Sequence, residues 1–586
     1  MNAVQQLLTD HIDIWTAAET EKKSGRGRAS GSAASVYGIK KLRELILDLA
    51  VRGKLVPQDA NDEPARELLE RIQTERARLV AEKRTRKGQP LSPIENQEKT
   101  FDLPCGWEWV RLGLIGDWGA GTTPSRSKSS YYGGTTPWFK SGELTADFID
   151  SSEETVTDLA LQECSLRLNQ PGDVLIAMYG ATIGKTAVLK IAGTTNQAVC
   201  ACTPNTGILN LYLLVLLKAM RSNFIDQGAG GAQPNISREK IIATVIALPP
   251  TEEQHRIVAK VDKLMALCDQ MEAQHRDAAT AHEQLVSHLL GTLTQSQSAA
   301  EFNANWQRIA AHFDTLFTTE ATIDTLKQTL LQLAVMGKLV AQDAKDEPAS
   351  ELLKRIQAEK IKLIEAGKIK KDKPTLEIGC REMAFQVPEG WAWSRMINCS
   401  SQITDGEHLT PQRTSDCTQI PLVTAKNVRD GIIDYTTTDF VDIDVAKKCW
   451  NRCKPEINDI LIVSVGATIG RLAIVESHCD MVIVRSVTLI KPLLIDVNYL
   501  SIALRSPLLQ KQIWSGVKQN AQPGLYLSVS QSLPIPLPPL PEQRRIVAMI
   551  TELMQMCEKL RSGIATAKRQ HIKIANVFVE RAILAQ

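Results

Sequence analysis

The sequence predicts an α+β protein in which two homologous, mixed α/β domains are separated by a pair of long antiparallel helices with coiled-coil-like pairing. Three observations lead to this fold class. Four sequence blocks occur twice in the same order, short strand signals lie between them, and each half ends in a long helical stretch. The chain therefore has an internal pseudo-twofold repeat.

The first repeated block lies in the helical region of each half. "LAVRGKLVPQDANDEPARELLERIQ" at residues 49–73 returns as "LAVMGKLVAQDAKDEPASELLKRIQ" at residues 333–357. Pro64 and Pro348 each follow Asp-Glu and precede an apolar periodicity, as a proline in the first turn of a helix does. We therefore expect the same helices to begin both halves.

The second and third blocks frame a mixed domain in each half. "LPCGWEW" at residues 103–109 returns as "VPEGWAW" at residues 387–393, and "GDVLIAMYGATIGK" at residues 172–185 returns as "NDILIVSVGATIGR" at residues 458–471. Short apolar segments rich in β-branched residues alternate there with Gly, Pro, Asn and Ser turns and one helix. This composition is typical of an α/β domain with short strands.

The third block also contains a segment similar to a phosphate-binding loop, "GATIGKT" at residues 180–186. A P-loop needs G-x-x-x-x-G-K-[ST], and here the two glycines are one residue too close. The flanking segments indicate strands on both sides, and the second copy, "GATIGRL" at residues 466–472, lacks the lysine and the hydroxyl. We therefore interpret the motif as a tight turn between strands, which argues against an ATPase.

The fourth block marks the start of a long helix. "LPPTEEQHRIVAKVDKLMALCDQ" at residues 248–270 returns as "LPPLPEQRRIVAMITELMQMCEK" at residues 537–559. Residues 252–294 and 542–584 contain no proline. A helix that covers either stretch spans roughly 65 Å. A single apolar stripe of this length needs a partner, and the equivalent helix is the obvious one. The stripes consist of Ile257, Val261, Leu264, Cys268 and Met271, and of Ile546, Ile550, Leu553, Cys557 and Leu560.

The repeat predicts five segments. They are an N-terminal helical region at residues 1–100, a mixed domain at 101–250, a central helical region at 251–383, a second mixed domain at 384–540 and a C-terminal long helix at 541–586. The central region combines the first long helix with the copy of the N-terminal helices.

The composition suits a soluble, multidomain protein, with 586 residues of which 43% are hydrophobic and 23% charged. No apolar run approaches the ~18 residues of a membrane span, and the N-terminal residues lack a signal-peptide pattern. We expect a cytoplasmic protein that binds no membrane. The net charge of +2 means that any DNA binding requires locally concentrated charge or a partner that supplies phosphate contacts.

The cysteines do not indicate a metal site. Twelve are scattered along the chain, and the closest pairs are Cys200 with Cys202 and Cys449 with Cys453. Neither pair has a matching second pair or nearby histidines at zinc-ligand spacing. We expect reduced, buried thiols and no metal.

Two mixed domains, each closed by "LPP-x-x-EQ-x-RIV" and a long helix, resemble the DNA-specificity subunit of type I restriction–modification enzymes. The similarity covers essentially the whole chain. Its landmarks are the paired Pro-x-Gly-Trp starts, the GATIG turns, the LPP/EQ boundaries, and "AQPNIS" at residues 232–237 against "AQPGLYLSVS" at residues 521–530. The repeated LAV-x-GKLV blocks suggest a longer-chain branch of the family.

The resemblance implies that the mixed domains are target recognition domains and that this chain is not itself an enzyme. It implies binding to double-stranded DNA, to two adenine-N6 methyltransferase (modification) subunits and, through them, to restriction/translocase subunits. No cofactor is expected in this chain; S-adenosylmethionine, and ATP with Mg²⁺ for restriction, belong to the partner subunits. The residues agree, because we find no S-adenosylmethionine-type Gly-rich strand end, no Asn/Asp-Pro-Pro-aromatic motif and no convincing nuclease cluster.

The two mixed domains share their frame but differ in the stretches between landmarks. "GAGTTPSRSKSSYYGGTTPWFKSGEL" at residues 119–144 faces "TDGEHLTPQRTSDCTQIPLVTAKNV" at residues 404–428 with little identity. Equal frames with different loops predict two different half-sites, and hence an asymmetric, bipartite DNA sequence. The helices would set the gap between the two half-sites. Half-sites about one helical turn apart, ~34 Å, would lie on one face of the duplex.

Candidate DNA-binding residues are the polar and aromatic residues of these loops, which could reach phosphates or base edges. The aromatic residues are more often core than stacking surfaces, and an asparagine before a strand is also an ordinary turn residue. In the first domain the candidates are Thr122, Thr123, Ser125, Arg126, Lys128, Tyr131, Tyr132, Trp138, Lys140, Lys185, Gln233 and Asn235. In the second they are Thr404, Glu407, His408, Thr410, Arg413, Lys426, Asn427, Arg429, Arg471, Gln522 and Tyr526.

Two other functions stay open at this point: a tandem-repeat scaffold that binds only proteins, and a self-sufficient DNA-modifying enzyme. The missing methyltransferase motifs and the broken P-loop count against the enzyme. The mismatch between the two sets of loops counts against the scaffold, because a symmetric scaffold has little reason to vary them.

Overall fold

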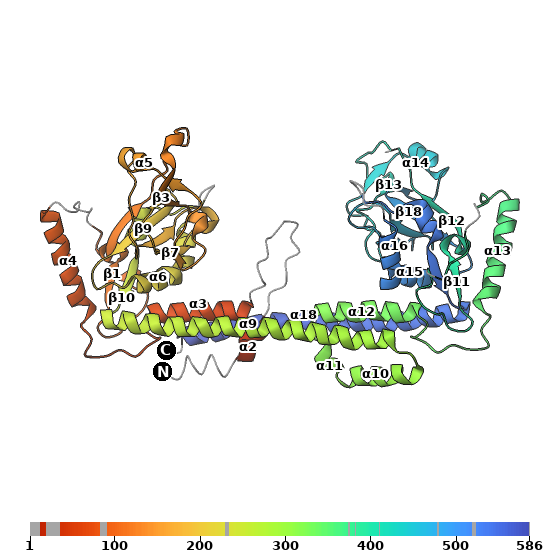
Figure 1. The fold of residues 1–586 in the computed structure, drawn as a ribbon, viewed down its shortest axis with the longest axis horizontal. Helices are drawn as coiled ribbons and strands as arrows, with labels where there is room; N and C mark the ends of the chain where they lie inside the picture. Colours follow the sequence, from red (N-terminus) through yellow and green to blue (C-terminus); the bar gives the residue numbers. More distant parts are fainter. Residues whose placement is uncertain are drawn as a thin grey trace. The chain divides into compact units, whose positions relative to one another are not determined.

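The computed structural model divides the chain into two compact units (Figure 1). The first unit is Met1–Ala278 with Ala567–Gln586, and the second is Ala279–Thr566. Each of the two long helices therefore has its ends in different units. The residues described are 12–18, 36–82, 91–228, 234–372, 376–380, 382–409, 411–477, 480–517 and 523–584.

The first unit is assembled from residues that lie far apart in the chain. Trp15 and Ala575 are both fully buried in the core that contains the apolar faces of α3 and α9. Its helices are α2 (Ile12–Ala17), α3 (Tyr37–Val51), α4 (Ala65–Ala81), α5 (Asp158–Glu163), α6 (Asn210–Ala219), α7 (Arg221–Gly228), α8 (Arg238–Ala243), the beginning of α9 (Thr251–Gln295) and the end of α18 (Leu540–Leu584).

Three sheets form the mixed domain of the first unit. The largest has the strand order β2 (Gly116–Ala120), β9 (Val199–Pro204), β6 (Val174–Ala177), β7 (Thr186–Leu189) and β4 (Phe148–Ile149). A smaller sheet has the order β5 (Thr155–Val156), β3 (Tyr132–Phe139) and β8 (Thr194–Thr195). The third is an antiparallel pair of β1 (Glu108–Arg111) and β10 (Val245–Leu248).

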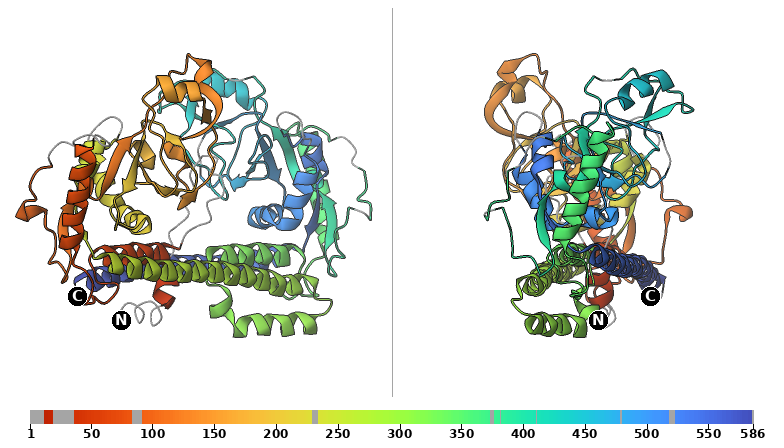
Figure 2. Two further views of the ribbon diagram at one scale, coloured as in Figure 1. Left: turned by 60° about the vertical axis from the view of Figure 1, so that its left-hand side comes forward. Right: turned by 90° about the vertical axis from the view of Figure 1, so that its right-hand side faces the viewer.

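The central strands are buried along most of their length because both faces of the large sheet are covered. Successive side chains of a strand point to opposite faces. On β9, Cys200 and Cys202 pack in the core with α6, whereas Val199 and Ala201 pack in a second core with Phe139 of β3. Helix α6 lies between the large sheet and α3 (Figures 1 and 2).

The second unit repeats this architecture. Its helices are α10 (Ala299–Ala311), α11 (Phe313–Leu316), α12 (Glu320–Val335), α13 (Ala349–Glu365), α14 (Ile443–Trp450), α15 (Val497–Arg505), α16 (Pro507–Ser515) and α17 (Leu527–Ser532), together with the end of α9 and the beginning of α18. Its sheets have the orders β12 (Ser400–Asp405), β18 (Val487–Pro492), β15 (Ile460–Val463), β16 (Leu472–Ile474); then β14 (Asp439–Val441), β13 (Ile420–Val423), β17 (Val482–Ile483); and β11 (Ala392–Arg395) with β19 (Pro534–Leu537). This is the strand order of the first unit without β4, whose place is taken by a single parallel bridge between Gly431 and Ala473.

The long helices α9 and α18 contain 45 residues each. In each unit, the beginning of one and the end of the other share a core: Met271 with Ala575 in the first unit, and Leu290 with Cys557 in the second. This is the arrangement of an antiparallel pair, and the predicted fold class is confirmed. Among the described residues, no helix is long and apolar enough to cross a membrane.

A buried glutamate explains why the first and fourth sequence blocks recur together. Glu253 is fully buried, and its carboxylate accepts hydrogen bonds from Trp107 Nε1 at 2.9 Å and Gln58 Nε2 at 3.1 Å. Arg256, one turn later, pairs with Asp62 at 2.6 Å. We call this arrangement the EQ clasp, because it ties the mixed domain, the long helix and the repeated helical block together. The second copy consists of Glu542, Trp391, Gln342, Arg545 and Asp346.

A buried arginine anchors the base of each mixed domain. Arg111 donates to Glu98 at 2.9 and 3.0 Å and to the carbonyl oxygens of Ser92 and Pro93 at 2.8 and 2.9 Å. The Arg111 guanidinium lowers the pKa of Glu98. We call this the arginine clamp. The second copy is Arg395, which donates to Glu382 and to the carbonyls of Leu376, Glu377 and Ser532.

The cysteines of the described residues are free thiols. Cys200 and Cys202 lie on β9, Cys449 and Cys453 lie at and just after the end of α14, and all four are buried. Burial raises the pKa of the Cys200 and Cys453 thiols to about 12, so they are protonated packing residues. Across the described ranges, no group of three or more His, Cys, Asp or Glu side chains could hold a metal ion.

Candidate nucleic-acid interface

The GATIG motif forms a tight turn between antiparallel strands, as predicted. In the first unit it lies between β6 and β7, with a short 3₁₀ turn at Gly180–Thr182. Gly184 has a φ of +74°, and a Cβ there would lie 2.7 Å from Arg221 Cγ. Gly470, its equivalent, has a φ of +88° and the same restriction from Gln510. These glycines are required by backbone conformation and close packing, and the strand-to-strand connection differs from that of a P-loop.

Each GATIG turn is joined to the segment that precedes the last short helix of its mixed domain. The Gly180 N–H donates to the Pro234 carbonyl at 2.8 Å, and the Gly466 N–H donates to the Pro523 carbonyl at 3.0 Å. The nearby candidates differ in exposure: Lys185 and Arg471 are half-buried, and Asn235 and Tyr526 are exposed. Gln233 and Gln522 lie outside the described residues.

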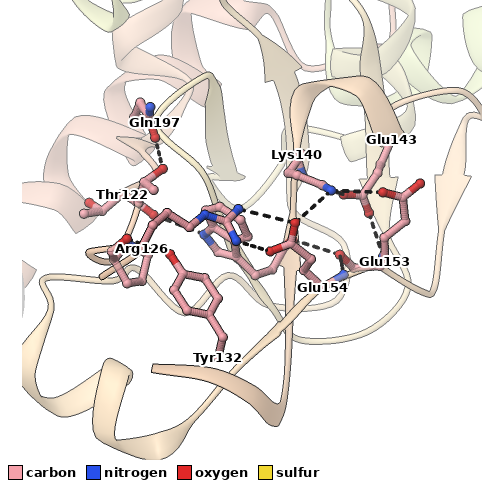
Figure 3. A network of polar contacts seen from close by, with 12 residues as sticks. Thr122, Arg126, Tyr132, Lys140, Glu143, Glu153, Glu154 and Gln197 are labelled. Atoms are coloured by element: carbon pink, nitrogen blue, oxygen red, sulfur yellow. Dashed lines mark hydrogen bonds and ion pairs between the residues drawn. The ribbon is translucent and has the colours of Figure 1, made fainter. Parts of the chain in front are cut away.

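In the first unit, the predicted reading loop forms an aromatic cage around an arginine (Figure 3). The Arg126 guanidinium lies 4.6 Å from the Tyr132 ring centroid and 4.9 Å from that of Trp138. Glu154 receives two hydrogen bonds from it, at 2.6 and 3.3 Å. Trp138 donates its indole N–H to the Thr122 carbonyl at 3.1 Å. The cage therefore holds the guanidinium plane in one orientation.

The other two cations of this loop are also paired. Lys128 contacts Glu163 at 2.5 Å and Tyr131 Oη at 3.0 Å, and the hydrogen bond with Glu163 raises the pKa of Lys128. Lys140 contacts Glu153 at 2.9 Å and Glu154 at 3.1 Å. We call the cations Arg126, Lys128 and Lys140, with the carboxylates Glu153, Glu154 and Glu163 and the cage rings, the first reading cluster.

The hydroxyl residues at the edge of this cluster contact each other or nearby side chains. Ser125 hydrogen-bonds Ser127 at 2.8 Å, and Thr123 Oγ1 contacts Gln197. Tyr131 and Trp138 are buried, with 8% and 1% of their surfaces exposed. Tyr131 and Trp138 are therefore core side chains in this conformation and not stacking surfaces for bases.

In the second unit, the equivalent loops contain a different network. His408 Nε2 lies 2.6 Å from Asp405 Oδ2, and Arg452 donates to the other oxygen of Asp405 at 2.5 Å. Burial would raise the pKa of Asp405, but these hydrogen bonds lower it below its ordinary value. The Glu407 carboxylate accepts the N–H groups of His408 and Leu409 and so shapes the turn.

The remaining cations of the second unit gather around two aspartates. Arg413 and Lys426 both contact Asp439, at 2.8 and 3.6 Å, and Arg429 lies 3.7 Å from Asp434. We call the residues around Asp405, Asp439 and Asp434 the second reading cluster.

Asn427 has a structural position within this loop. It is fully buried, and its amide bonds Thr424, the Asp434 carbonyl and Thr438. It presents no amide atom at the surface in this conformation. Thr404 lies half-buried on β12, and Thr410 lies outside the described residues. DNA contact by the whole set of candidates stays a prediction.

Sequence reasoning missed the acidic partners of both clusters. The carboxylates are Glu153, Glu154 and Glu163 in the first unit and Asp405, Asp434 and Asp439 in the second, and Arg452 is a further cation. Glu153 and Glu154 are adjacent in the sequence, and this acidic pair after a basic loop was the available signal.

Comparisons with known proteins relate this chain to restriction enzymes. A family described as "Type I restriction modification DNA specificity domain" matches residues 104–281 and 416–566. The type I restriction enzyme EcoAI specificity subunit of Escherichia coli is 37% identical over 599 residues, covering 99% of this chain and 100% of that protein. The corresponding EcoEI subunit, also from Escherichia coli, is 35% identical over 611 residues with the same coverage. The solved HsdS subunit of Thermoanaerobacter tengcongensis is 18% identical, covers 83% of this chain and 98% of that one, and aligns with a TM-score of 0.38.

Proposed function

The chain belongs to the type I restriction enzyme specificity subunits, and from this premise we propose that it reads a bipartite, asymmetric site in double-stranded DNA with one target recognition domain per half-site. One observation carries the proposal. The EQ clasp and the arginine clamp are the same in both units. The two reading clusters share an arginine–carboxylate pair, Arg126–Glu154 and Arg413–Asp439, but differ around it. The first has the aromatic cage and the Lys128–Glu163 pair, whereas the second has the network of Asp405 with His408 and Arg452. Two domains with the same buried framework but different exposed loops are suited to bind two different DNA sequences.

The division of labour follows from the same premise. We propose that this chain performs no catalysis and that it binds, in a cytoplasmic complex, two adenine-N6 methyltransferase subunits and restriction/translocase subunits. The relatives' names as specificity subunits support this assignment. S-adenosylmethionine, and ATP with Mg²⁺, would then act in the partner subunits.

A methylation map tests the proposal. The chain and its neighbouring methyltransferase are expressed together in a host that lacks adenine methylation, and the DNA is sequenced for N6-methyladenine. We expect an asymmetric, bipartite motif only when both proteins are present.

Each protein expressed alone is the control. Methylation by this chain alone would show that it contains an active site. A motif that does not change when this chain is omitted would favour the protein-binding scaffold.

A further inference from the structure

All three cations of the first reading cluster are held by carboxylates of the same unit. Arg126 pairs with Glu154, Lys128 with Glu163, and Lys140 with Glu153 and Glu154. Binding of any of these cations to a DNA phosphate must therefore replace an existing ion pair. Since non-specific DNA binding depends almost entirely on such phosphate contacts, the cluster is poorly prepared for it.

Arg126 differs from the two lysines because its position is fixed on several sides. The rings of Tyr132 and Trp138 lie beside its guanidinium. Glu154 binds both of its terminal nitrogens (Figure 3). The Tyr132 hydroxyl donates to the Pro124 carbonyl at 2.6 Å, and the Trp138 indole donates to Thr122, so both rings are anchored. The arginine nevertheless keeps 54% of its side chain exposed.

This geometry suits recognition of a base edge more than attraction of a phosphate. A guanidinium has five N–H groups, and the two hydrogen bonds to Glu154 leave three. A rigid, planar donor group can read the two acceptors of a guanine edge with little loss of side-chain freedom. A contact with a phosphate does not require the plane of the guanidinium to be fixed.

We propose that Glu154 is a positioning residue for sequence discrimination, which holds Arg126 in the aromatic cage as a base-reading contact and keeps Arg126 and Lys140 from sequence-blind phosphate contacts. This inference rests on the proposed function. In the complex with the correct half-site, the Arg126–Glu154 pair stays intact. On other DNA, phosphate binding requires that the pair breaks.

The test uses Glu154→Gln in the full chain with its methyltransferase. Affinity is measured against salt for a duplex with the mapped motif and for the same duplex with the half-site of the first domain scrambled. The variant should bind the scrambled duplex more tightly. The slope of the logarithm of its binding constant against the logarithm of the salt concentration should be steeper by about 0.9 for each freed cation. It should bind the correct duplex more weakly, so that discrimination falls roughly tenfold, the range of one bidentate base contact.

Two further variants separate positioning from folding and from net charge. Arg126→Lys keeps the charge but loses the planar fork, so binding to the scrambled duplex should be unchanged while discrimination falls. Glu75→Gln breaks an exposed pair with Arg78 on α4 and makes the same charge change elsewhere, so it should leave discrimination as in the wild type.

The outcomes are distinct. Equal changes in affinity for both duplexes, or no change with Glu154→Gln, would overturn the role of Glu154. An equal loss of discrimination with Glu75→Gln would assign the effect to net charge. A wild-type complex that does not distinguish the two duplexes would refute the proposed function itself, and this inference with it.

Discussion

The two mixed domains match in the buried polar groups of the EQ clasps and arginine clamps and differ in the exposed contacts of their reading clusters. Glu253 and Glu542 accept the same pair of hydrogen bonds from a tryptophan and a glutamine. In contrast, Arg126 and Arg413 each pair with a carboxylate, but among the described residues only Arg126 has aromatic rings beside its guanidinium. Buried charges need fixed partners, whereas exposed ion pairs contribute little to stability, so the loops can change while the fold remains.

The largest effect is expected from the arginine clamps. Arg111→Met and Arg395→Met each remove a buried guanidinium with its hydrogen bonds to a carboxylate and to backbone carbonyls, and each should lower the free energy of unfolding by about 3 kcal/mol, the upper end for hydrogen bonds to a charged group. Urea unfolding followed by circular dichroism measures this. Arg66→Met, in an exposed pair with Glu70, is the control and should have almost no effect. Unequal losses at the two clamps would contradict the equivalence of the frames.

A smaller loss is expected at a buried amide of the second unit. Asn427→Ala removes a fully buried amide and leaves Thr424 and the Asp434 carbonyl without their partner, at a cost of about 1–3 kcal/mol. The thermal unfolding midpoint should fall, and methylation of the mapped motif should fall with it. Normal stability together with lost methylation would instead indicate a direct contact between Asn427 and DNA.

The EQ clasps predict a matched pH dependence. Burial raises the pKa of Glu253 and Glu542, although the hydrogen bonds from tryptophan and glutamine oppose it. A carboxylate with a raised folded-state pKa destabilises the fold when ionised. Stability should therefore increase as pH falls from above the folded pKa to the ordinary value near 4.5.

The corresponding glutamine variants isolate this effect. Glu253→Gln and Glu542→Gln should lose that part of the pH dependence, and the two variants should respond alike. Chemical unfolding between pH 4.5 and 7.5 provides the measurement. A pH dependence that persists in both variants would show that other groups cause it.

The smallest effect on stability is expected in the reading loops. Arg413→Ala removes an exposed pair with Asp439 and should change the free energy of unfolding by at most about 1 kcal/mol. It should nevertheless reduce recognition of the half-site read by the second domain, which sequencing of methylated DNA would show. A loss of several kcal/mol would mean that this loop belongs to the frame.

The frame could be predicted from the sequence because the same residues recur at the same spacing. The reading clusters could not, because their contacts depend on which strands pair. Glu154 is 28 residues from Arg126 in the sequence. It reaches the cage because β5 pairs with β3, and beside this pairing the backbone N–H of Trp138 donates to the Glu154 carbonyl. The short match between "HIDIW" at residues 11–15 and "HFDTL" at residues 312–316 was also missed, although α2 and α11 begin within it, at Ile12 and Phe313.

The shared long helices have a consequence for synthesis on the ribosome. The core of the first unit contains Ala575, fully buried, and the Tyr37 hydroxyl donates to Asn576 at 2.9 Å, a contact that spans 539 residues. The first 278 residues therefore emerge and must wait for nearly the whole remaining chain before their core is closed. Such long-range contacts slow folding and expose apolar surface in the meantime. Nascent chains that stop before residue 567 should be the species that chaperones and proteases encounter most.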